Sequence, residues 1–333
     1  MTQYIIKRIL LFIPMLFVIS MLVFVLIQLP PGDYLTTVLM RMAESGEEVD
    51  QSLIEGLTRQ YGLDRPLYRQ YLLWISNIVF RGNFGRSFEW GLPVADIIWE
   101  RLAWTVVLSL GSIVFIWIVS FPIGVYSATH QYSFFDYLVT LFGFLGKATP
   151  NFLLALILMW AGWSWFGWTM GGLFSPEYQR EAWSWAKFVD LLKHLWVPLV
   201  VLGTAGTANL IRILRSNLLD ELEKPYVQAA RAKGVSEFKL IWKYPVRIAI
   251  NPIVSTVGGL LPEIVSGTII TAIVLNLPTV GPLLFTALTA EDMQLASSIV
   301  MVLAILTVIG TFISDMLLLW IDPRIRFDQE QTA

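Results

Sequence analysis

The chain has no cysteine, only two histidines and few charged residues in a length of 333. The lack of cysteine excludes disulfide bonds, thiolate catalysis and cysteine-ligated metals. His130 and His194 lie too far apart in the sequence to form a local metal-binding pair. Charged residues make up 14% of the chain, whereas soluble domains average about 25%. The formal net charge of −2 gives no sign of nucleic-acid binding at the level of the whole chain.

Apolar residues are abundant instead, at 56% of the chain with a mean hydropathy of +0.65. This composition excludes a disordered chain and an ordinary soluble enzyme. A helix needs about 20 mostly apolar residues to cross a bilayer. Six runs approach or exceed that length and predict an all-α integral membrane protein with six transmembrane helices, over residues 9–29, 102–128, 137–165, 195–211, 248–275 and 293–314.

The placement of the basic residues predicts how the chain is oriented. The connector 212–247 carries eight basic and four acidic side chains, whereas the connector 276–292 carries only two acidic ones. Basic connectors stay in the cytosol, so 212–247 is predicted to be cytosolic. Lys7 and Arg8 precede the first run and agree, which places both termini in the cytosol. We expect the first run to be retained, because it is too long for the apolar core of a signal peptide.

Besides 276–292, two connectors then face the outside, residues 30–101 and 167–194. The first contains an amphipathic pattern over residues 68–80, which predicts a helix. Tryptophans surround the second and are typical of the interface between membrane and water. A platform that stacks carbohydrate rings is the alternative. The tryptophans of this set are Trp163, Trp165, Trp168, Trp183, Trp185 and Trp196.

No pattern supports chemistry by the chain itself. Gly146 and Lys147 look faintly like a phosphate-binding loop, but Leu141 stands where that loop needs glycine, and Ala148 where it needs serine or threonine. The sequence shows no Ser/His/Asp arrangement and no cluster of paired carboxylates. We therefore expect no catalytic residue, no metal site and no bound cofactor in this chain. Active transport would then take its energy from a partner or an ion gradient.

The segment 226–245 is the most informative part of the sequence. It predicts two short cytosolic helices, the first followed by Gly234, which suits the position just after a helix, and the second capped by Ser236. Ala229 and Ala230 give the first helix a small surface that another protein can approach closely. A basic connector that only sets the topology is the alternative. The second helix presents Phe238, Ile241 and Trp242 at helical spacing.

The order Gln228-Ala229-Ala230, three residues and then Gly234 resembles the EAA loop of binding-protein-dependent ABC transporter permeases, with glutamine in place of glutamate. Further stretches along nearly the whole chain resemble the dipeptide, oligopeptide and nickel permease family of such importers. These stretches are residues 4–8, 61–71, 82–87, 231–234 and 322–326. Each stretch alone is weak evidence for the family, but together, in this order and with six spans, they are specific for it.

The resemblance implies a type I ABC importer permease fold with a long periplasmic loop after the first helix, in a bacterial or archaeal cytoplasmic (inner) membrane. The chain then divides into an N-terminus with the first helix (1–30), a periplasmic segment (31–101), a five-helix core (102–321) and a cytosolic tail (322–333). The implied partners are a second homologous permease, two ATP-binding subunits that hold ATP and Mg²⁺, and a periplasmic or lipoprotein substrate-binding protein. The residues that would contact the ATP-binding subunits are Gln228, Ala229, Ala230 and Gly234.

Two charged residues lie inside predicted spans, Lys147 in the third and Glu263 in the fifth. Charges at such depth are costly and usually face the bundle interior or a water-filled path. These two either pair with each other or face the cargo. Glu263 departs from the small residue that the family often has near this position. Asn151 and Asn209 are further polar residues inside spans, where they serve helix packing or the translocation path.

The cargo is the property that the sequence determines least. The family imports dipeptides, oligopeptides, nickel complexes and, in some members, oligosaccharides, and the two poorly placed histidines argue against nickel. We expect peptide cargo, with an oligosaccharide as the alternative. An ion-coupled secondary transporter, with Lys147 and Glu263 as a proton relay, is a less favoured alternative. Six spans, no visible inverted repeat and the EAA-like loop stand against it. The lack of catalytic groups stands against a membrane-embedded enzyme.

Overall fold

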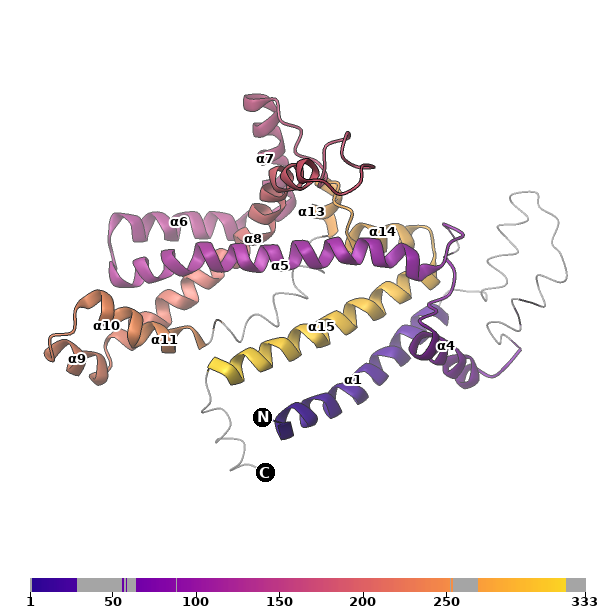
Figure 1. Cartoon of the computed structure of the whole chain (residues 1–333), viewed down its shortest axis with the longest axis horizontal. Coiled ribbons are helices and arrows are strands. Elements are labelled where there is room, and N and C mark those ends of the chain that lie inside the picture. Colours follow the sequence, from indigo (N-terminus) through magenta and orange to yellow (C-terminus); the bar gives the residue numbers. More distant parts are fainter. Residues whose placement is uncertain are drawn as a thin grey trace. The chain divides into compact units, whose positions relative to one another are not determined.

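A computed structural model of the chain describes residues 2–28, 56, 58, 64–87, 89–251, 253 and 269–321 (Figure 1). The regular elements in this part of the chain are helices, besides an isolated bridge between Arg86 and Pro93. The all-α prediction is therefore confirmed. Glu263 and the tail 322–333 lie outside the described residues, as does most of the first half of the predicted periplasmic segment.

The chain forms two compact units. The first unit consists of Met1–Ala103 with Leu283–Val308, and the second of Trp104–Pro282 with Ile309–Ala333. The second unit holds the residues that the sequence singled out for function, apart from Glu263, which is not described. The first unit holds the N-terminal helix and the described part of the predicted periplasmic segment.

Four of the described helices are long and apolar enough to cross a membrane. They confirm the first, second, fourth and sixth of the predicted runs. The helix over the fourth run is much longer than the apolar stretch 195–211. Polar turns extend it at both ends. The four helices are α1 (Thr2–Gln28), α5 (Val94–Thr129), α8 (Trp185–Leu222) and α15 (Met293–Ile321).

The third predicted run is not one helix. It divides into α6 (Phe134–Ala148) and α7 (Asn151–Phe166), which meet at an angle of 106°. Pro150 causes the break, because a proline lacks the N–H of a helical residue and disfavours helix in the residue before it. Thr149 accordingly has an extended ψ of 122°. The sequence prediction of a single span over 137–165 missed this bend; the pair counts as a fifth span only if it crosses as a broken helix.

The fifth predicted run, 248–275, lies mostly outside the described residues. Its ends are visible as α11 (Pro245–Ala249), which begins just before the run, and α13 (Ile269–Val274). A short apolar helix, α14 (Val280–Thr289), follows. Six spans are therefore neither confirmed nor contradicted by the described part of the chain.

In the first unit, the predicted amphipathic helix is present as α4 (Leu67–Arg81). It packs against α1 through an aromatic cluster, in which the ring of Tyr71 lies 5.5 Å from that of Phe24 and 6.1 Å from that of Phe17. The Tyr71 hydroxyl also forms a hydrogen bond of 2.7 Å with the hydroxyl of Ser20. The apolar face that the sequence pattern predicted thus has its partner in the first helix.

The loop after α4 is tied to the start of α15 by a buried carboxylate. Asp292, which is fully buried, accepts hydrogen bonds from the hydroxyl of Ser87 at 2.5 Å and from the backbone N–H of Leu295 at 3.0 Å. Gln294 donates to the carbonyl of Phe84 at 2.7 Å. Gly85 has a φ of +89°, a left-handed conformation that favours glycine, and a Cβ there would also lie 2.5 Å from Nε2 of Gln294. The family-like stretch 82–87 therefore has a structural role.

In the second unit, α8 is the helix around which the others pack. One core cluster joins it to α5 and α11 through residues that are almost completely buried, Ile116, Leu214, Leu218, Val246 and Ile253. A second cluster joins it to α5, α7 and α13 through Leu108, Ala155, Val201 and Ala272. Figure 1 shows α9, α10 and α11 at the end of α8 where α5 turns into α6.

Candidate functional site

The EAA-like segment folds as two short helices directly after α8. They are α9 (Pro225–Ala232) and α10 (Glu237–Lys243), as the sequence predicted. Gly234 lies in the turn between them with φ +77°, a left-handed conformation that favours glycine. Ser236 occupies the N-cap position of α10, although its side chain forms no capping hydrogen bond.

Three buried side chains hold α9 and α10 together. Val227 and Leu240 are fully buried and Ala230 is nearly so, and the three form one apolar cluster. Gln228 and Ala229, by contrast, are exposed. The four predicted contact residues therefore do not share one role, because Ala230 packs inside the pair of helices. The sequence analysis also missed Leu240, whose place within the helical repeat of α10 could have marked it as the buried residue.

Polar contacts fix this pair of helices internally and to α8. Arg231 and Glu237 form an exposed ion pair at 2.5 Å, and the hydrogen bond from Arg231 holds the pKa of the Glu237 carboxyl below its usual value. The Tyr226 hydroxyl donates to Glu221 at 2.5 Å, which links α9 to the last turn of α8. Burial, together with this hydrogen bond, raises the pKa of Tyr226, so that the phenol remains a donor.

A buried ion pair joins α8 to the start of α6. Arg215 donates two hydrogen bonds of 2.9 Å to the two carboxylate oxygens of Asp136, in the bidentate geometry that such pairs favour. The hydroxyl of Ser127 and the backbone N–H of Tyr132 donate to the same carboxylate. Asp136 is buried and fully satisfied, so α6 and α8 are fixed to each other beside the turn that follows α5.

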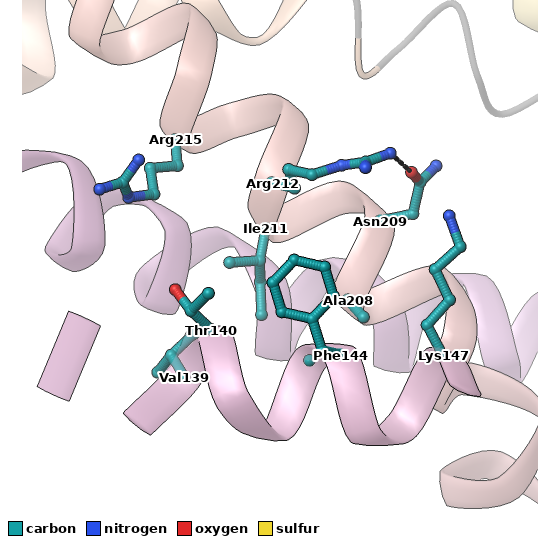
Figure 2. A pocket seen from close by; sticks show the side chains of 10 residues that line it. Val139, Thr140, Phe144, Lys147, Ala208, Asn209, Ile211, Arg212 and Arg215 are labelled. Carbon is teal, nitrogen blue, oxygen red and sulfur yellow. Dashed lines mark hydrogen bonds between the residues drawn. The ribbon is translucent and has the colours of Figure 1, made fainter. Parts of the chain in front are cut away.

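Next to this ion pair, α6 and α8 line a pocket of about 180 Å³, named here the α6–α8 pocket (Figure 2). It brings together two of the predicted path residues, Lys147 from α6 and Asn209 from α8. Asn151 is not on its lining but begins α7, half-buried, and Glu263 is not described. The lining consists of Val139, Thr140, Gly143, Phe144, Lys147, Ala208, Asn209, Ile211, Arg212 and Arg215.

A close helix contact sets the geometry of the α6–α8 pocket. Gly146 lies so near α8 that a Cβ at this position would be 2.6 Å from Cγ2 of Thr204. This contact brings Lys147 beside Asn209, and Figure 2 shows the Lys147 side chain extending toward it. From the other side Arg212 donates a hydrogen bond of 3.1 Å to Oδ1 of Asn209.

A second, larger pocket of about 650 Å³ lies near the first turns of α8, and its lining includes Trp168, Trp196, Asp190, Lys193 and His194. The carboxylate of Asp190 there accepts hydrogen bonds from the backbone N–H and the hydroxyl of Ser175, at 2.8 and 2.7 Å. All six tryptophans of the predicted interfacial set are exposed.

Within the described residues no group of three or more His, Cys, Asp or Glu side chains is placed to hold a metal ion.

Comparison with known families decides what kind of protein this is. The family described as "binding-protein-dependent transport system inner membrane component" matches residues 120–327, and its N-terminal companion family matches residues 1–109. The chain belongs to this family. It is a permease, a multi-pass inner-membrane component of a binding-protein-dependent transport system.

Curated relatives match the permease along nearly its whole length. The oligopeptide transport system permease protein AppB of Bacillus subtilis (strain 168) is 35% identical over 98% of this chain and 100% of the relative. The glutathione transport system permease protein GsiC of Escherichia coli (strain K12) is 32% identical over 98% of this chain and 100% of the relative. The resemblance stated from the sequence motifs is confirmed.

A solved structure shares the fold. The structure is titled as inward-facing conformations of the MetNI methionine ABC transporter, and it superposes with a TM-score of 0.54 at 14% identity. The match covers 68% of this permease and 96% of the other chain. This likeness establishes a common helical architecture with an ABC importer permease.

Proposed function

We propose that the permease is one membrane subunit of an ATP-driven ABC importer whose cargo is a peptide. The full-length relatives support this, because their names give oligopeptide, dipeptide and glutathione as what they transport. The partners are a second, homologous permease, two ATP-binding subunits that carry ATP and Mg²⁺, and a periplasmic or lipoprotein substrate-binding protein. Surrounding lipid completes the assembly.

The topology proposed for the permease has six transmembrane helices with both termini in the cytosol. The four long helices, the bent pair α6–α7 and the partly described run 248–275 supply the spans. Residues 31–101 form the periplasmic segment, 102–321 the five-helix core and 322–333 the cytosolic tail. The charge of the basic connector 212–247 supports this orientation. The helices α9 to α11 also lie at the same end of α8 as the turn between α5 and α6, as expected for two connectors on the cytosolic side (Figure 1).

The observation that carries the proposal is the construction of α9 and α10. The pair presents Gln228, Ala229 and the Gly234 turn on its surface, while buried Val227 and Leu240 keep it rigid. It follows α8 after only a short turn, and Tyr226 binds the last turn of that helix. A rigid pair with a small exposed face suits docking to an ATP-binding subunit, whose movement would then reach the spans through α8.

Gly234→Val tests this coupling in the assembled transporter. A β-branched residue at φ +77° costs about 1–3 kcal/mol of strain and distorts the turn between α9 and α10. We expect the variant to insert and assemble, and to hydrolyse ATP with several-fold less peptide uptake per ATP. Uptake and hydrolysis are measured together in proteoliposomes that contain all subunits and the binding protein.

Gly167→Val is the matched control, because Gly167 also follows a helix with positive φ, +67°, and has open space around it. It carries the same strain but lies outside the docking segment, so its uptake per ATP should equal that of the wild type. Normal uptake per ATP in the Gly234 variant would contradict the docking role.

The same proteoliposomes test the energy source and the cargo. We expect uptake of short peptides to stop with a non-hydrolysable nucleotide and to continue with a protonophore. The reverse pattern would indicate an ion-coupled transporter. Uptake of oligosaccharides in place of peptides would overturn the cargo but leave the ATP-driven mechanism intact.

A further inference from the structure

The α6–α8 pocket gathers positive charge from both of its helices. Among the described residues its lining contains Lys147, Arg212 and Arg215 and no acidic side chain. The charge of Arg215 is matched by Asp136 just outside the lining. Lys147 and Arg212 have no ion-pair partner within the part of the chain that the structure describes, and they approach Asn209 from two sides (Figure 2).

Asn209 completes a set of hydrogen-bond donors. Its Oδ1 accepts from Arg212 at 3.1 Å, which leaves its amide N–H groups to donate into the pocket. The lysine ammonium and the arginine guanidinium are donors only, and the NH2 group of Asn209 donates as well. The apolar side chains of Phe144 and Ile211 lie beside them. Such a site favours a small anion that carries an apolar group next to its charge.

The site is formed before any ligand binds. The contact of Gly146 with Thr204 and the bidentate pair of Asp136 with Arg215 fix α6 against α8. Binding therefore does not have to bring the two helices together.

The positions of the lining residues along α6 and α8 bear on where the anion comes from. At about 1.5 Å per residue, Lys147 lies about 20 Å along α6 from its first residue, and Arg212 lies about 15 Å from the last residue of α8. Lys147 and Asn209 belong to the predicted spans 137–165 and 195–211, whereas Arg212 directly follows the second of these runs, so the pocket lies toward the cytosolic end of α8. Charged residues inside spans usually face the bundle interior or a water-filled path. The anion is then a group that travels along the path.

We propose that Lys147, Arg212 and Asn209 bind the C-terminal carboxylate of the peptide while it crosses the membrane. This inference rests on the proposed function, in which the cargo is a peptide. The two cations and the Asn209 amide bind the carboxylate, and Phe144 and Ile211 contact the terminal side chain. The permease thus selects cargo with a free carboxyl end, in addition to any selection by the binding protein.

The test compares a peptide that has a free C-terminus with the same peptide as its C-terminal amide. Both are taken up by proteoliposomes that contain the complete transporter, with either wild-type permease or Lys147→Met. For each permease, the preference is the uptake of the free peptide divided by the uptake of the amidated peptide. The binding protein and the ATP-binding subunits are identical in both preparations, so a difference between the two preferences reflects the pocket. We expect Lys147→Met to reduce the preference for the free carboxylate about tenfold, which corresponds to about 1.4 kcal/mol.

Two variants serve as controls. Lys147→Arg keeps the charge and should keep the preference. Lys7→Met removes an exposed lysine of α1 that lines neither pocket, and should leave the preference unchanged.

Three results would overturn the inference. The first is an equal loss of uptake for both peptides in Lys147→Met. The second is an effect that follows the anionic lipid content of the vesicles and not the peptide terminus, which would make the pocket a lipid site. The third is full rescue of Lys147→Met by Glu263→Gln for both peptides, which would show a structural pair. Wild-type vesicles that take up neither peptide with ATP would contradict the proposed function itself.

Discussion

We expect the ion pair of Asp136 with Arg215 to contribute strongly to the stability of the second unit. Arg215→Met would leave the Asp136 carboxylate buried with only two of its four hydrogen bonds. Removing one partner of a fully buried pair costs about 3–5 kcal/mol, and we expect a smaller cost here because the Arg215 side chain is 27% exposed. We expect a marked fall in the Tm of the purified permease in detergent.

Arg231→Met is the matched control, because it removes an arginine whose ion pair with Glu237 is exposed. Exposed pairs contribute little to stability, since water screens them and the side chains lose freedom. The Tm of this variant should equal that of the wild type. Similar Tm values for the Arg215 and Arg231 variants would show that the contact between α6 and α8 does not depend on the buried pair.

At the scale of elements, the packing of α6 on α8 depends on the absence of one methyl group. Gly146→Ala would place a Cβ 2.6 Å from Cγ2 of Thr204, a distance at which one helix has to move. We expect a lower Tm and a changed preference between the free and the amidated peptide, because Lys147 moves with α6. Both are measured on the same purified and reconstituted protein.

Gly143→Ala provides the comparison, one helical turn away on the same face. Its Cβ would meet that of Ala208 at 3.7 Å, an ordinary contact, so this variant should be neutral or slightly more stable. Thr204→Ser removes the Cγ2 methyl and should rescue Gly146→Ala. No rescue would mean that the close contact is not what the glycine permits.

Some elements could be predicted from the sequence because local rules determine them. The bilayer sets a minimum length for apolar helices, which located α1, α5, α8 and α15, and a glycine after a helix located the turn at Gly234. The bend at Pro150 was missed because the apolar run continues through it, although the proline was a local signal.

The contacts that form the candidate sites were beyond prediction for a different reason. Asp136 and Arg215 lie far apart in the sequence, as do Ser87 and Asp292. Only the packing of the helices brings each pair together. Lys147 and Asn209 could be selected because polar residues in a span are rare, but their shared pocket depends on how α6 packs on α8.

At the scale of the whole molecule, the proposed orientation can be measured because the chain contains no cysteine. A single cysteine in place of exposed Glu177, in the outer connector, should react with a membrane-impermeant maleimide added to intact spheroplasts. A cysteine in place of exposed Phe238, in α10, should react only after the membrane is opened. Labelling is read on a gel by the mass of the attached reagent.

Labelling of the Phe238 site in intact cells would place α10 outside and contradict the orientation. Each variant also serves as the control for the other, since both sites are exposed on the isolated chain.

The continuity of α8 has a mechanical consequence. The helix contains Pro198, where the missing N–H weakens the backbone, and then runs unbroken to Leu222 beside α9. That stretch is a stiff arm about 36 Å long, so a swing of about 5° about the proline would displace its cytosolic end by about 3 Å. Because the ion pair of Arg215 with Asp136 fixes α6 to this stretch of α8, the α6–α8 pocket would move with α8 as a rigid body. If the pocket binds the peptide carboxylate as proposed, α6 and α8 would carry it together during such a movement.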